Sequence, residues 1–316
     1  MRGVDATMAA RRAESFTKRS IKSASKRHAL RCAMSMLDLT TLEGKDTPEK
    51  VRALCRKARQ PVDLPAGAKP LDPPVPPVAA VCVYPTMVPV AREALEGSTV
   101  RVAAVATGFP SAQYPLDIRL RDCADAIAAG ADEIDMVISR GLFLAGRLDE
   151  IAHEIRETRA MCARPPAGRP AHLKVILETG ELETLDNVRR ASDLAIEAAC
   201  SVPGLPQPAD GEVFIKTSTG KVQPAATMPV TLVMLEAIRD RFMASGIRIG
   251  MKPAGGIRTA KQAIAYLVMV KETLGDEWLS PHLFRFGASA LANDIARQVL
   301  RMDSGGYSAA YDVTEA

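Results

Sequence analysis

Short apolar runs alternate along most of the chain with stretches whose apolar residues recur every three or four positions. Short apolar runs are typical of strands buried on both faces, and the longer repeat is typical of amphipathic helices. The runs expected to form strands are 33–41, 79–84, 99–107, 133–138, 172–178, 214–216, 247–252 and 283–287. A helical pattern follows each of them, and the alternation fills roughly 270 residues, the usual size of a barrel of eight such units.

This alternation predicts an α/β protein with a (β/α)8 TIM barrel. A doubly wound open sheet is the alternative, but the G-x-G-x-x-G fingerprint that it often carries is absent from the sequence. Thr47 followed by Pro48, Thr259 and Ser289 are start signals for three of the helices. The expected division is a basic N-terminal extension (1–30), a single barrel domain (31–302) and a C-terminal tail (303–316).

Composition narrows the class of protein. Apolar residues make up 47% of the chain and aromatic residues only 4%, so the core must be built from aliphatic side chains, which favours α/β layering over a β-sandwich.

The six cysteines show no C-x-x-C pair, so reduced thiols in the cytoplasm are expected and no metal is predicted. Four histidines offer few bases for a serine or cysteine triad. No apolar run is long enough to cross a membrane.

The charge is unevenly distributed. Residues 1–30 contain eight Lys and Arg against two acids, which leaves 33 basic and 35 acidic side chains in the rest of the chain. The body therefore lacks the clustered basic face that nucleic-acid binding needs. The basic arm is expected to be a solvated helix ahead of the barrel, with an organelle-targeting peptide as the minor alternative, because such peptides avoid acids.

The stretch F-I-K-T-S-T-G-K at 214–221 places Lys216 at the mouth of an apolar strand. Lysine is almost never fully buried without a partner, so this position calls for a reason. One reason is an amine nucleophile that forms a Schiff base with a carbonyl substrate after losing its proton. The alternative is a lysine that extends from the strand end into water.

The C-terminal strand ends of a barrel meet on one face, which carries the active site. Four charged residues of the predicted strands are expected at this face: Asp38, Asp135, Lys216 and Lys252. Two lysines on adjacent strands bring like charges together, and burial acts in the same direction, so one ammonium is driven to lose its proton. The alternative for Lys252 is a structural ion pair with Asp135.

The two aspartates suit supporting roles. Asp135 is suited to move protons on and off the reacting groups, directly or through one water. Asp38 is suited to orient a substrate hydroxyl or to tune Lys252. An acid that only caps the turn at Thr40 and Thr41 is the alternative for Asp38.

Three loops at the same face predict an anion site. They are A-G-G-I-R-T (254–259) after the seventh strand, G-A-S (287–289) after the eighth and T-G-K (219–221) after the sixth. Barrels frequently bind phosphate at the loops after strands seven and eight, where glycines let backbone N–H groups approach an anion. Tight turns without a ligand are the alternative use of these glycines.

Several sequence blocks between residues 33 and 302, taken together, resemble the 2-deoxyribose-5-phosphate aldolase family of class I aldolases. The blocks are F-I-K-T-S-T-G-K, K-P-A-G-G-I-R-T, D-E-I-D-M-V-I, K-V-I-L-E-T-G-E-L, L-D-L-T-T-L, V-C-V-Y-P and F-R-F-G-A-S. The G-F-P turn at 108–110 and the A-A-Y tail at 309–311 are most similar to the eukaryotic-type branch. The resemblance implies reversible cleavage of 2-deoxy-D-ribose 5-phosphate to D-glyceraldehyde 3-phosphate and acetaldehyde, in deoxyribonucleotide catabolism. It implies no cofactor and no partner beyond these small molecules, although a homo-oligomer is compatible with it.

The resemblance also implies roles for individual residues. Lys216 would form the Schiff base, Lys252 would lower its pKa, Asp135 would move protons and Asp38 would support it. A tyrosine of the tail would assist proton transfer at the enamine, with Tyr311 preferred over Tyr307. The residues implied at the phosphate are Gly220, Lys221, Gly255, Gly256, Arg258, Gly287 and Ser289.

Two other functions remain open from the residues alone. A catalytically silent phosphosugar-binding protein would use the same barrel and anion loops. Another Schiff-base barrel enzyme, similar to transaldolase or to fructose bisphosphate aldolase, would use the same lysine on a ketose phosphate.

Overall fold

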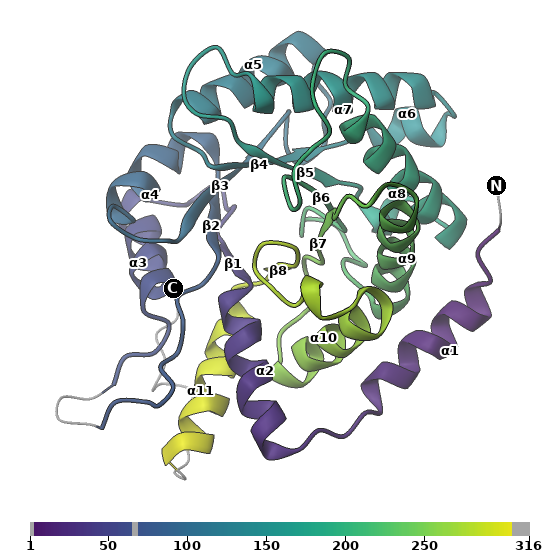
Figure 1. The fold of residues 1–316 in the computed structure, drawn as a ribbon. Coiled ribbons are helices and arrows are strands. Elements are labelled where there is room, and N and C mark those ends of the chain that lie inside the picture. Colours follow the sequence, from purple (N-terminus) through teal and green to yellow (C-terminus); the bar gives the residue numbers. More distant parts are fainter. Residues whose placement is uncertain (1–2, 65–68, 305–316) are drawn as a thin grey trace.

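The computed structural model describes residues 3–64 and 69–304. Its centre is a sheet of eight parallel strands in the order β7-β6-β5-β4-β3-β2-β1-β8. Isolated bridges pair Met251 with Phe284 and Ala254 with Gly287, which closes the sheet between its two end strands. Figure 1 shows the strands around the middle of the molecule and the helices as a ring outside them. The predicted barrel is therefore confirmed.

The strands are short and almost completely buried. They are β1 (Leu37–Thr40), β2 (Ala80–Val83), β3 (Arg101–Ala106), β4 (Glu133–Val137), β5 (His172–Ile176), β6 (Val213–Lys216), β7 (Gly250–Lys252) and β8 (Phe286–Gly287). Their side chains alternate between two environments, because successive residues of a strand point to opposite faces. In β4, Ile134 and Met136 pack in the main hydrophobic core, whereas Asp135 joins polar groups inside the barrel.

Helices follow the strands as the pattern predicted. The α-helices are α1 (Ala6–Thr17), α2 (Ser23–Ser35), α3 (Pro48–Arg59), α4 (Val88–Ala94), α5 (Leu116–Ala128), α6 (Arg140–Leu144), α7 (Leu148–Ala163), α8 (Leu185–Cys200), α9 (Met228–Ser245), α10 (Ala260–Leu274) and α11 (Ala290–Ser304). Three single turns of 3-10 helix are η1 (Pro85–Met87), η2 (Thr179–Glu181) and η3 (Asp276–Trp278). Thr47 and Thr259 cap α3 and α10 as predicted. None of the described helices has the length and apolar character needed to cross a bilayer.

The first strand is shorter than its apolar run. Residues 33–35 form the end of α2, and the strand begins only at Leu37. Ala33 and Met34 are fully buried on the helix. The predicted strand over 33–41 was therefore too long, because an apolar run by itself does not distinguish a buried helix end from a strand. The short helix α6 also carried too little periodicity to be predicted.

The basic N-terminal segment is folded against the barrel. Helix α1 packs against α9 and α10, and α2 packs against α10 and α11. Figure 1 shows α1 in purple on the outside of the helix ring. Arg12 pairs with Glu236 at 2.7 Å, so part of the basic charge is neutralised by acids of the barrel helices. The domain boundary predicted after residue 30 falls inside α2.

We expect Phe16→Ala to lower the free energy of unfolding by about 3 kcal/mol, because it empties a buried aromatic position. Phe16 lies on α1, is only 3% exposed and belongs to the main hydrophobic core. Met8 on the same helix is 58% exposed, so Met8→Ala should change stability by less than about 0.5 kcal/mol. Urea unfolding of both variants measures the difference. Equal stabilities would mean that α1 contributes nothing to the fold.

Candidate active site

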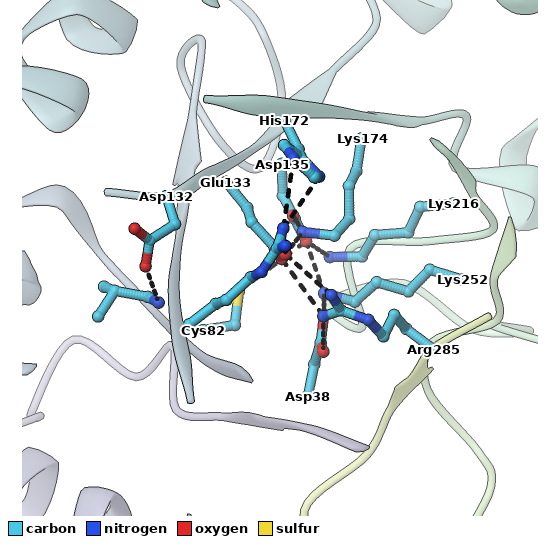
Figure 2. A network of polar contacts seen from close by, with 12 residues as sticks. Asp38, Cys82, Asp132, Glu133, Asp135, His172, Lys174, Lys216, Lys252 and Arg285 are labelled. Carbon is cyan, nitrogen blue, oxygen red and sulfur yellow. Dashed lines mark hydrogen bonds and ion pairs between the residues drawn. The ribbon is translucent and has the colours of Figure 1, made fainter. Parts of the chain in front are cut away.

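Four charged residues predicted from separate strands meet inside the barrel. The Nζ atoms of Lys216 and Lys252 lie 2.7 and 2.8 Å from the same oxygen, Oδ2 of Asp135. Lys252 also lies 2.6 Å from Oδ2 of Asp38. Figure 2 shows these side chains converging from different strands on one point. The two amines are therefore within about two hydrogen-bond lengths of each other.

Lys216 sits at the C-terminal end of β6 and is only 2% exposed. Burial lowers the pKa of the Lys216 amine below its ordinary value, and the charge of Lys252 acts in the same direction. Asp135 opposes this shift without reversing it. The alternative of a lysine that reaches into water is excluded by this burial. A buried amine with a lowered pKa is what carbonyl attack requires.

Lys252, at the end of β7, has the opposite tendency. Burial alone would lower its pKa, but the carboxylates of Asp135 and Asp38 outweigh burial and raise the pKa of Lys252 above its ordinary value. Lys252 therefore keeps its proton while Lys216 is inclined to lose one. Lys252 lies close to the Lys216 amine, as predicted, and is also paired with Asp135, as the alternative stated. Both hold because the Asp135 carboxylate contacts both amines.

The two aspartates remain ionised in this surrounding. Burial opposes ionisation of Asp135, but Lys174, Lys216 and Lys252 hold its pKa well below the usual value. Lys252 and Arg285 lower the pKa of Asp38 in the same way. The Asp38 carboxylate faces these cations, which favours the supporting role over a turn cap.

Three further charged side chains in the barrel interior were not predicted: Glu133, Lys174 and Arg285. Lys174 on β5 donates to Glu133 and to Asp135, the latter at 3.0 Å. Arg285, just before β8, donates to Glu133 at 2.9 Å. A signal for them exists in the sequence, since E-I-D, H-L-K and F-R-F each place a charge at an inward position of an apolar strand.

The glycine loops lie at the C-terminal ends of β7 and β8. Gly255 and Gly256 have φ angles of +81° and +83°, which favour glycine. A Cβ on Gly255 would meet that of Ala225 at 2.6 Å, and one on Gly287 would meet that of Ala254 at 2.7 Å. At Gly255 and Gly287 the backbone is thus packed too closely for any other residue. The N–H of Gly255 donates to the Gly287 carbonyl at 3.2 Å, so turn geometry already accounts for part of the glycine requirement.

Two polar side chains of the predicted anion site, those of Lys221 and Ser289, have other partners in this structure. Lys221 lies next to Gly220 and forms an ion pair with Glu43, across the barrel mouth, at 2.9 Å. The Ser289 hydroxyl donates to the Thr40 carbonyl at 2.8 Å and accepts from the Thr40 N–H. Arg258 is exposed. An anion would have to compete with Glu43 for Lys221.

The predicted tail tyrosines, Tyr311 and Tyr307, lie outside the described residues. Within residues 3–64 and 69–304, no group of His, Cys, Asp and Glu is arranged to hold a metal ion.

Comparison with known proteins gives consistent results. Residues 32–295 match the model of the DeoC/LacD family aldolase. The chain is 46% identical over 308 residues to human deoxyribose-phosphate aldolase, covering 96% of this chain and 91% of the human one, and is also 46% identical to the mouse protein. The solved apo structure of a protein from Toxoplasma gondii, titled as a deoxyribose-phosphate aldolase, aligns with a TM-score of 0.70 at 22% identity, over 88% of this chain and 98% of that one. The deoxyribose phosphate aldolase from Aeropyrum pernix aligns with a TM-score of 0.57 at 19% identity, over 87% and 97%. By its barrel, its lysine-rich interior and these matches, the chain belongs to the DeoC/LacD aldolase family.

Proposed function

We propose that the protein is a Schiff-base aldolase that reversibly cleaves 2-deoxy-D-ribose 5-phosphate into D-glyceraldehyde 3-phosphate and acetaldehyde. The observation that carries this proposal is the contact of Lys216 and Lys252 with one oxygen of Asp135. Such a pair supplies one neutral and one charged amine at the same carboxylate. The human and mouse relatives, each 46% identical to this chain, are named deoxyribose-phosphate aldolase, which supports the choice of substrate.

In the proposed reaction, the neutral Lys216 amine attacks the C1 aldehyde of the substrate. Loss of water from the carbinolamine gives an iminium ion, which withdraws electrons from the C2–C3 bond. Asp135, through one water, takes the proton of the C3 hydroxyl as that bond breaks, and glyceraldehyde 3-phosphate leaves. Lys252 contacts the same oxygen of this carboxylate and helps to hold it in place.

The remaining enamine is protonated at C2, and hydrolysis of the resulting iminium releases acetaldehyde and restores Lys216. Tyr311 or Tyr307 would assist this protonation. The iminium supplies the electron withdrawal that a bound metal ion supplies in other aldolases, so the proposed steps call for no cofactor. The phosphate group of the substrate would lie against the loops that contain Gly220, Gly255 and Gly287.

Reductive trapping tests the proposal. The protein is incubated with acetaldehyde and borohydride, and its mass and peptide map are compared with those of a sample without acetaldehyde. We expect one added ethyl group on Lys216, together with release of glyceraldehyde 3-phosphate from 2-deoxy-D-ribose 5-phosphate. Absence of an adduct on Lys216 under conditions of ligand binding would favour a silent phosphosugar-binding protein. Preference for a ketose phosphate donor would favour another Schiff-base barrel enzyme.

Lys221→Ala should raise KM for the phosphorylated substrate roughly tenfold while leaving kcat largely unchanged, because it removes one charged contact to the phosphate. Steady-state rates with 2-deoxyribose 5-phosphate and with 2-deoxyribose measure the effect. The unphosphorylated sugar is the control, since its KM should not change. An equal change for both sugars would place Lys221 away from the phosphate.

We also propose that the protein acts in the cytoplasm on these small molecules alone, in deoxyribonucleotide catabolism. Its six cysteines are all free thiols, which suits a reducing compartment. A homo-oligomer is compatible with this proposal, and the Aeropyrum pernix protein is described as tetrameric.

A further inference from the structure

Six buried charges inside the barrel form a closed ring of alternating sign. Within the ring, each carboxylate contacts two of the three cations, and each cation contacts two of the three carboxylates. In order, the members of this charge ring are Asp38, Lys252, Asp135, Lys174, Glu133 and Arg285, which returns to Asp38. All six are at most 3% exposed. Figure 2 shows the ring seen from close by.

The contacts are short throughout. Arg285 lies 2.8 Å from Asp38 and 2.9 Å from Glu133, and Lys252 joins Asp38 to Asp135. Three carboxylates and three cations balance, so the charge ring has no net charge. Balance matters here because an uncompensated charge in a buried site is costly.

Lys216 is a seventh charge attached to the neutral ring. Among residues 3–64 and 69–304, its amine forms an ion pair only with Asp135, which already contacts Lys174 and Lys252. Protonated Lys216 therefore gives the cluster an excess positive charge, whereas each cation of the ring has two carboxylate partners. Loss of a proton from Lys216 restores neutrality without breaking the ring.

We propose that the charge ring as a whole, and not Lys252 alone, makes Lys216 the group that gives up its proton. The proposed reaction gives no role to three members of the ring, which are then positioning residues. We call them the distal residues: Glu133, Lys174 and Arg285. This inference rests on the proposed role of Lys216 as the Schiff-base lysine.

The other polar neighbours do not disturb this balance. Burial and the charge of Asp135 raise the pKa of the Cys82 thiol on β2 to about 11, so it is neutral at pH 7. Burial lowers the pKa of His172 on β5 to about 4, so it is neutral as well. Arg101 on β3 approaches Glu133 at 3.3 Å from the rim, but its side chain is 38% exposed and its charge is screened by solvent.

Removing a positive charge and removing a negative charge from the distal residues should shift the pKa of Lys216 in opposite directions. Arg285→Met removes a cation, so the remaining charges balance with Lys216 protonated, and its pKa should rise by about one unit or more. Glu133→Gln removes a carboxylate while keeping the shape, and the pKa of Lys216 should fall by a similar amount. The double variant restores neutrality of the ring, and its Lys216 pKa should return close to that of the unmodified protein.

The experiment titrates the Lys216 amine directly. Proteins with 13C at the lysine Cε are followed by NMR as a function of pH, and the Lys216 signal is assigned by its loss in Lys216→Arg. The pH dependence of kcat/KM is measured on the same variants. Arg121→Met, on an arginine whose side chain is 83% exposed, is the control for loss of one positive charge and should leave the pKa unchanged. Thermal melting establishes that each variant is folded.

Opposite shifts in Arg285→Met and Glu133→Gln, with a return in the double variant, would support the charge ring. A purely structural role predicts that the double variant is the most perturbed in every readout. If Arg285→Met does not fold, Lys174→Met removes a cation of the same ring and must raise the pKa. No shift, or shifts in the same direction, in the folded variants overturns the inference. The NMR titration does not depend on turnover, so opposite shifts in a protein without aldolase activity would refute the proposed function and leave the charge ring standing.

Discussion

Replacing Lys216 by arginine should reduce the cleavage rate by on the order of 10⁴-fold or more and abolish the trapped adduct. Arginine keeps the positive charge next to Asp135, but its guanidinium stays protonated and forms no Schiff base. Arginine can replace lysine in the ion pair with Asp135, which is 2.7 Å long in the unmodified protein, so the fold should persist. Initial rates of glyceraldehyde 3-phosphate formation and the intact mass after borohydride treatment measure the two effects.

Lys261→Arg is the matched control, because Lys261 is an exposed lysine on α10. That variant should retain the full rate and the full adduct. If Lys216→Arg retained more than about a hundredth of the rate, the nucleophile would have to be another amine.

The second large effect is expected for Lys252→Met, which should lower the rate at pH 7 by roughly 100-fold and restore part of it at alkaline pH. Only the neutral Lys216 amine attacks the aldehyde. Lys252 carries a positive charge that keeps the pKa of Lys216 low, so its removal raises that pKa. A smaller neutral fraction then remains at pH 7, and this fraction increases about tenfold per pH unit until the new pKa is passed.

The pH profile of kcat/KM between about pH 5 and 10 measures this shift. The acidic limb should move to higher pH in Lys252→Met and stay closer to its original position in Lys252→Arg, which keeps the charge. An unchanged acidic limb in a folded Lys252→Met protein would contradict the proposal that Lys252 lowers the pKa of Lys216.

The sequence allowed the fold to be predicted because its signal is repeated. Eight apolar runs with eight helical patterns agree on one architecture, and errors at single boundaries do not change it. The boundaries themselves were less accurate, as at residues 33–35, which are helical although they continue an apolar run. Helix α6 has five residues, too few to show a period.

Some of the site residues could be predicted from the sequence and others could not. Lys216 and Lys252 stood out because a lysine in an apolar strand is rare, and the barrel rule placed both at one face. Glu133, Lys174 and Arg285 follow the same pattern, but one charge in an apolar strand does not reveal its partner across the barrel. The roles assigned to all of these residues remain proposals.

The sequence alone determined the order of strands and helices and the presence of charges at inward strand positions, since both depend on local pattern and alternation. The tertiary structure decided which charges meet. Barrel closure brings β1, β4, β5, β6, β7 and β8 around one interior, and there Lys216 contacts one carboxylate while each cation of the charge ring contacts two. Residues far apart in the chain set that balance through direct contact, and such contacts depend on the register and closure of the sheet.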